Sequence, residues 1–172
     1  MSYEEVLRRT LVAAAKEIGT LIRKEELKRQ ALSASINRPI AENLLQSIES
    51  KLATMPDLAK EVGEAMAKAF KEGKPVLETA IEKFVESILK SLPIAITGGL
   101  NELKTMIEGV NQQVEVANRI LEKINEAGIF TPRLEKISCK DDYMSLFSAM
   151  KIAKERLKII IDFYRELEKV SS

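Results

Sequence analysis

Apolar residues recur at alternating spacings of four and three along most of this chain, and this period constrains the fold more than any other feature. Because an α-helix turns once every 3.6 residues, such spacing places apolar side chains on one helix face. The chain also has only 7 Gly and 5 Pro among 172 residues, few for a turn-rich β protein. The sequence therefore predicts an all-α helical bundle.

The alternation is clearest in two stretches of similar length, residues 100–127 and 141–170. A linker that contains Pro132 and Cys139 joins them. Two long, heptad-patterned helices joined in this way predict an antiparallel C-terminal pair.

Four other prolines punctuate the first half of the chain at intervals of 17, 19 and 18 residues: Pro39, Pro56, Pro75 and Pro93. Proline is tolerated in the first turn of a helix, where its missing N–H costs nothing. We therefore predict several shorter, Pro-initiated helices within residues 39–96. Residues 1–36 should form an N-terminal helix that either packs on the bundle or projects as an arm, within a single helical domain spanning residues 1–172.

Catalytic chemistry is poorly represented in this sequence. It contains no His and a single Cys, which excludes the usual nucleophilic triads, the histidine-based di-iron motif of helical bundles and Cys-rich zinc sites. Glu78, Glu82 and Glu86 share one helix face, which favours a solvated acidic surface over a Mg²⁺ site or a basic partner. We expect no enzymatic activity, no cofactor and no metal.

The last predicted helix has two apolar seams. A helix with two seams either lies centrally in its fold or offers one seam to a partner. Phe147 falls on a basic face of the same helix, which also indicates a contact with another chain or with the linker. The candidate partner contacts are Phe147, Ile152, Ile159, Phe163 and Val170.

Basic side chains form stripes on the first and last predicted helices. Such stripes could follow a nucleic-acid phosphate backbone, although interleaved acids favour ordinary solvated faces. The net charge of only +1 also argues against strong attraction to polyanions. The candidate phosphate contacts are Arg9, Lys16, Arg23, Lys151, Lys154, Lys158, Arg165 and Lys169.

We predict a non-enzymatic assembly or scaffold protein that contacts itself or another protein through helix faces and is oligomeric. The alternative is a helical protein that binds a nucleic-acid backbone, of the ribonucleoprotein or viral nucleoprotein type. A carrier of apolar ligands, using residues 92–100, is a third and weaker reading. The single Cys and the absence of an 18-residue apolar run favour a cytoplasmic protein without a membrane span, and the Glu/Lys-rich composition suits a thermophile.

Overall fold

The computed structural model describes residues 2–96 and 99–172, with only the backbone described for residues 91–96. The described chain is all-helical, as predicted, and contains no strand. Its six helices are α1 (Tyr3–Ile18), α2 (Lys24–Thr54), α3 (Leu58–Lys71), α4 (Val76–Ile96), α5 (Gly99–Glu126) and α6 (Tyr143–Ser171).

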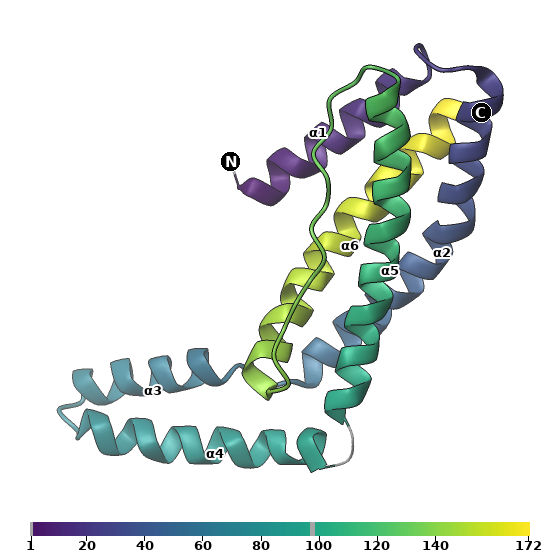
Figure 1. Ribbon diagram of the computed structural model, residues 1–172. Helices are drawn as coiled ribbons and strands as arrows, with labels where there is room; N and C mark the ends of the chain where they lie inside the picture. The colour runs from purple at the N-terminus through teal and green to yellow at the C-terminus, as the bar shows by residue number, and fades with distance from the viewer. Residues whose placement is uncertain (1, 97–98) are drawn as a thin grey trace.

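The molecule has two parts, which Figure 1 shows as an upright bundle and a projecting arm. Helices α1, α2, α5 and α6 form the bundle, which we call the stalk. Helices α3 and α4 pack against each other and project from one end of the stalk, and we call this pair the hairpin. Helix α1 packs on α6, so the N-terminal helix is not an arm, and the projecting part of the molecule is this internal hairpin.

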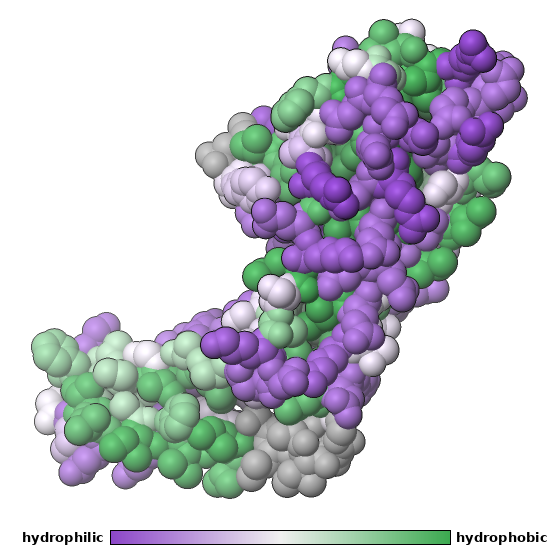
Figure 2. Space-filling view, in the orientation of Figure 1, coloured by the Kyte–Doolittle hydropathy of each residue, from purple (hydrophilic) through white to green (hydrophobic). Residues whose placement is uncertain are grey.

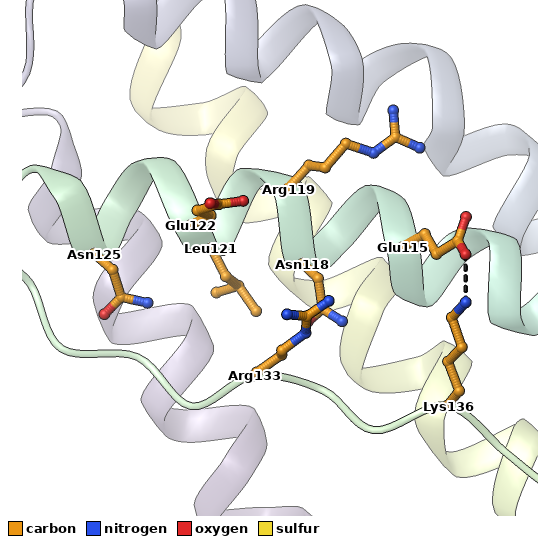
Figure 3. Close-up of a pocket in the computed structure, with 8 residues that line it drawn as sticks. All are labelled: Glu115, Asn118, Arg119, Leu121, Glu122, Asn125, Arg133 and Lys136. Carbon is orange, nitrogen blue, oxygen red and sulfur yellow. Dashed lines mark hydrogen bonds and ion pairs between the residues drawn. The ribbon is translucent and has the colours of Figure 1, made fainter.

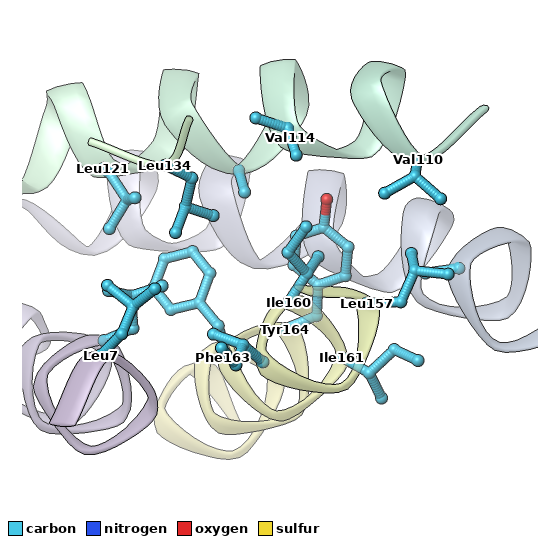
Figure 4. Packing of buried hydrophobic residues seen from close by; sticks show 14 of the residues in the cluster. Leu7, Val110, Val114, Leu121, Leu134, Leu157, Ile160, Ile161, Phe163 and Tyr164 are labelled. Carbon is cyan, nitrogen blue, oxygen red and sulfur yellow. The ribbon is translucent and has the colours of Figure 1, made fainter. Parts of the chain in front are cut away.

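Helix α6 is the centre of the stalk, because it packs against α1, α2 and α5. Both of its apolar seams are used in this way, and Phe163 and Tyr164 are fully buried (Figure 4). The Tyr164 hydroxyl donates a 2.9 Å hydrogen bond to Oε1 of Gln113 on α5, and Nε2 of Gln113 donates to Oδ1 of Asn37 on α2. This polar chain joins three helices across the core.

The prediction of a Pro-initiated helix at Pro39 is wrong, because α2 continues through that residue. Proline lacks an N–H, so α2 gives up one backbone hydrogen bond there, while burial of Ala34, Ala41 and Ile48 holds both halves against the stalk core. The predicted N-terminal helix of residues 1–36 is also interrupted, since α1 ends at Ile18 and a turn precedes α2. Pro56 and Pro75 lie just before α3 and α4, and Pro93 falls within the bounds of α4.

The predicted antiparallel C-terminal pair is also wrong, because α5 and α6 run in the same direction (Figure 1). The linker between them is extended and returns along α5 to the end where α5 began, so that Lys104 near that end pairs with Asp141 at 2.8 Å. A dozen extended residues at about 3.3 Å each span roughly 40 Å, the length of a 28-residue helix at about 1.5 Å per residue. The linker is therefore long enough to return the chain to the level where α5 begins, so that α6 can run parallel to α5.

Three asparagines on α5, spaced seven residues apart, fix the linker to that helix. Each accepts a linker backbone N–H at Oδ1 and donates from Nδ2 to a linker carbonyl, pairing Asn125 with Thr131, Asn118 with Leu134 and Asn111 with Ile137. Seven helical residues rise about 10.5 Å and three extended residues about 10 Å, so every third linker residue meets the next asparagine. We call this set the asparagine ladder.

Candidate interaction surface

The two helices of the hairpin meet through small side chains. Ala69 of α3 and Ser87 of α4 are buried between them, and Ala65 and Ala80 are half-buried. The Ser87 hydroxyl also donates to the Glu61 carboxylate across the pair. Small contact residues let the two helices pack closely, and most of the larger apolar side chains of α3 and α4 lie outside the contact between them.

Those larger side chains are exposed. Phe70 is 80% and Leu77 is 73% accessible, which is high for residues of this size. Figure 2 shows apolar side chains gathered over the hairpin, most densely along α4, whereas the visible face of the stalk is largely hydrophilic. The exposed set, which we call the hairpin face, consists of Met66, Phe70, Leu77, Ile81, Phe84, Val85 and Leu89.

Helical geometry places five of these seven residues on one side of the hairpin. At 100° per residue, Met66 and Phe70 point about a quarter turn away from the α4-facing side of α3. Leu77, Ile81 and Phe84 point about a quarter turn away from the α3-facing side of α4, and the opposite directions of the two helices bring both groups to the same side. Val85 and Leu89 continue this surface around the outer edge of α4.

The hairpin face exposes roughly 700 Å², taking about 180 Å² for one large apolar side chain. The largest apolar patch on a typical monomer is about 300–600 Å². A second row on α2, made by Leu32, Ile36 and Ile40, exposes only about 300 Å² on the same basis, within the ordinary range. The hairpin face therefore exceeds the ordinary range for an exposed apolar patch, and the row on α2 does not.

No charged residue of α3 or α4 falls on the side of the hairpin that carries Met66, Phe70, Leu77, Ile81 and Phe84. Glu78 and Glu82 follow the outer edge of α4, while helical geometry turns Lys68 and Lys71 of α3 toward the opposite side of the hairpin. A partner could therefore cover these five apolar side chains without burying an unpaired charge, which would be costly.

The root of the hairpin is attached to the stalk by specific polar contacts. Asp57 caps α3 by accepting from the backbone N–H of Lys60, and it also accepts from Nζ of Lys151 on α6 at 3.0 Å. The Lys151 hydrogen bond, aided by the capping bond, lowers the pKa of the Asp57 carboxyl. The Tyr143 hydroxyl donates to the carbonyl of Pro56 at 2.9 Å, and burial raises the pKa of Tyr143 to about 12. These bonds orient the hairpin where it leaves the stalk.

The predicted partner contacts on α6 are mostly covered by the chain itself. Ile159 is 3% accessible and Phe163 is fully buried, because α1 and α2 pack over that seam. Val170 is half-buried against the stalk core, and only Ile152 is exposed, at 51%. The second seam therefore serves the central position of α6, and a partner could reach only Ile152.

Phe147 is half-buried near the root of the hairpin. Its ring stacks on Tyr143, with 6.1 Å between ring centroids, and Nζ of Lys151 lies 4.5 Å from its centroid. Its position on a basic face is thus explained by a cation–π contact within the chain.

Many of the candidate phosphate contacts are paired with acids of the same chain. Arg165 contacts Glu42 at 3.0 Å, and Lys151 contacts Asp57. Arg9, Lys158 and Lys169 form ion pairs with acids three or four residues away on their own helices. Within the described chain, Lys16, Arg23 and Lys154 have no such pair, but Lys16 lies on α1, Arg23 in the turn before α2 and Lys154 on α6, so they share no helix face.

Among the described residues no cluster of carboxylates or Cys could hold a metal ion. Partial burial and the Asp141 carboxylate raise the pKa of the Cys139 thiol, which opposes a nucleophilic role. Residues 92–100, considered as a site for apolar ligands, fall largely outside the side chains that the structure describes.

A cavity of about 440 Å³ lies between α5 and the linker (Figure 3). Asn118, Asn125 and Arg133 contribute to its lining, and Lys136 of the linker pairs with Glu115 of α5. Since the asparagines are engaged in the ladder, the cavity is a polar seam of the fold and not an apolar ligand site.

Searches with the whole chain found no matching family model, no similar curated protein and no similar solved structure. Across the part of the chain that the structure describes, none of the helices combines the length and the apolar character that crossing a bilayer requires.

The hairpin face was not among the predicted contact residues, although its pattern is present in the sequence. Its large apolar residues recur at helical spacing, which is also the pattern of a core-facing seam. Only the structure shows that the small residues of α3 and α4 are the ones that meet.

Proposed function

We propose that this protein is a non-enzymatic assembly protein whose stalk holds the hairpin in a fixed orientation and whose hairpin face binds another protein chain. The observation that carries the proposal is the exposure of seven large apolar side chains on one side and along the outer edge of two paired helices. An apolar surface of this size, bordered by charges, is typical of a protein contact site.

The construction of the stalk supports the same function. Its core is continuous through α1, α2, α5 and α6, and the asparagine ladder adds the linker to it. The hairpin, by contrast, buries little besides Leu58, Ala69 and Ser87 among its described side chains. Covering the hairpin face would supply the apolar burial that the hairpin lacks by itself.

Binding of a nucleic-acid backbone is less well supported. The ion pairs on α1 and α6 neutralise most of the predicted stripes, and releasing any of the paired Lys or Arg side chains to a phosphate would break an existing pair. Titration of the protein with single- and double-stranded nucleic acid at two salt concentrations tests this alternative. We expect no salt-dependent binding.

Photo-crosslinking in cells that produce the protein tests the proposed function. A photoreactive amino acid replaces Leu77 on the hairpin face or, as the control, Lys68 on the opposite side of α3. The proposal predicts a crosslinked protein product from position 77 and none from position 68. Absence of a product at position 77, or equal yields at the two positions, would contradict it.

A further inference from the structure

We infer that the partner of the hairpin face is a second copy of this chain, docked about a two-fold axis so that the tip of each hairpin lies on the root of the other. This inference rests on the proposed function, since it names the protein that the hairpin face binds. Three features of the hairpin support it: the size of the face, the distribution of large and small residues along α3, and the placement of charge.

The size of the hairpin face fits a dimer. A stable interface of ordinary size buries about 800 Å² on each partner. The five exposed side chains on the shared side, Met66, Phe70, Leu77, Ile81 and Phe84, supply roughly 500 Å², more than half of that area. Face-to-face docking would also turn two exposed helix pairs into a four-helix bundle, in which each hairpin acquires an apolar core.

The distribution of residue size along α3 is self-complementary. On the side that carries the hairpin face, the tip of α3 presents the large Met66 and Phe70, whereas the root presents Ala59 and Gly63. A Cβ added at Gly63 would meet nothing within 4 Å, so there is open space above this part of the helix. A two-fold axis perpendicular to the helices places the large side chains at the tip of one copy over the small residues at the root of the other. The symmetry repeats this contact, so it occurs twice in the same interface.

The placement of charge favours a protein copy over a lipid surface. Glu78 and Glu82 border the hairpin face, and anionic lipid headgroups would repel them. The lysines Lys68 and Lys71, which would attract such headgroups, lie on the opposite side of the hairpin. A second copy presents apolar side chains to apolar side chains, and it leaves the carboxylates of both copies at the solvated edge.

Sedimentation velocity on the purified full-length chain is the first test. We expect a species of twice the 19.3 kDa chain mass at micromolar concentration. Phe70→Glu and Ile81→Glu should each raise the dimer dissociation constant tenfold or more. Lys68→Gln produces the same change in net charge on the opposite side of α3 and should leave the dissociation constant unchanged. Circular dichroism checks that each variant remains helical, which is expected because both replaced side chains are exposed.

A disulfide between copies tests the arrangement itself. In a Cys139→Ser background, a mixture of the Gly63→Cys protein and the Phe70→Cys protein should crosslink on oxidation, and neither protein alone should do so. Crosslinking of each protein with itself to the same extent would overturn the tip-on-root arrangement. If the protein remains a strict monomer up to about 100 μM, the inference that a second copy binds the hairpin face is wrong. Any dimer tighter than ordinary weak contacts would form at that concentration.

The crosslinking in cells separates failure of this inference from failure of the proposed function. A product from position 77 with twice the chain mass supports both. A product of any other mass overturns the second copy and leaves the hairpin face as a protein contact site. Absence of a product overturns both.

Discussion

Replacement of Asn118 by Ala tests whether the asparagine ladder holds the linker on α5. Asn118 donates to the carbonyl of Leu134 at 2.9 Å and accepts from the N–H of Leu134 at 2.8 Å. Each hydrogen bond contributes about 1 kcal/mol net, and Ala offsets about 0.5 kcal/mol through its higher helix propensity. The variant should therefore lose about 1.5 kcal/mol of unfolding free energy, which lowers Tm by about 3–6 °C for a chain of this size.

Asn101→Ala is the matched control, because Asn101 is exposed on the same helix. It should be neutral or slightly stabilising, since only the propensity difference applies. Thermal and urea unfolding measure both variants, and amide hydrogen exchange at Leu134 reports the local effect. Equal stabilities for the two variants, with unchanged exchange at Leu134, would refute the role assigned to the ladder.

Three further outcomes are expected. Tyr164→Phe should cost about 1–2 kcal/mol in urea unfolding, because it leaves Oε1 of the buried Gln113 without its donor; an unchanged midpoint would contradict this. The pKa of Asp57 is lowered in the folded protein, so the ionised Asp57 contributes fully to the free energy of unfolding above about pH 4, and this contribution is lost as the pH falls further. Asp57→Asn should therefore make the free energy of unfolding less dependent on pH in that acidic range. Gly19→Ala should destabilise the protein at the junction of α1 and α2 by about 1–3 kcal/mol, because the added Cβ would lie 2.5 Å from Cγ1 of Val170. A variant as stable as the parent in thermal unfolding would contradict this, since it would mean that the contact relaxes at no cost.

Apolar periodicity was sufficient to predict the helices but not their directions. Residues 100–127 and 141–170 match α5 and α6 to within two residues at either end, because both helices bury a continuous seam. The relative direction depends on the path of the linker. Asn111, Asn118 and Asn125 specify that path, and their seven-residue spacing was a readable signal in the sequence.

Proline was a poor guide to helix starts because burial can outweigh one lost hydrogen bond. At Pro39 the flanking alanines of α2 are fully buried against the stalk, and the helix continues. The turn after Ile18 was missed for the opposite reason, since the apolar spacing of α1 extends as far as Leu21 although the helix does not.

The sequence places the candidate contacts on α6, whereas the structure exposes a larger set of apolar side chains on α3 and α4. Two apolar seams on α6 indicated either a central helix or a contact surface, and burial of Ile159 and Phe163 supports the central position. The exposed surface belongs to α3 and α4 instead. Sequence cannot separate these cases, because a core seam and a contact seam have the same period and composition.

Amide hydrogen exchange along α4, followed at two protein concentrations, tests the central claim most directly. The hairpin buries little of its own surface, so its protection should depend on whether the hairpin face is covered. We predict that amides between Leu77 and Leu89 become more protected as the concentration rises from about 1 to 100 μM, a range that spans ordinary dimer affinities, while those of α6 remain unchanged. Protection along α4 that is the same at both concentrations would contradict the account.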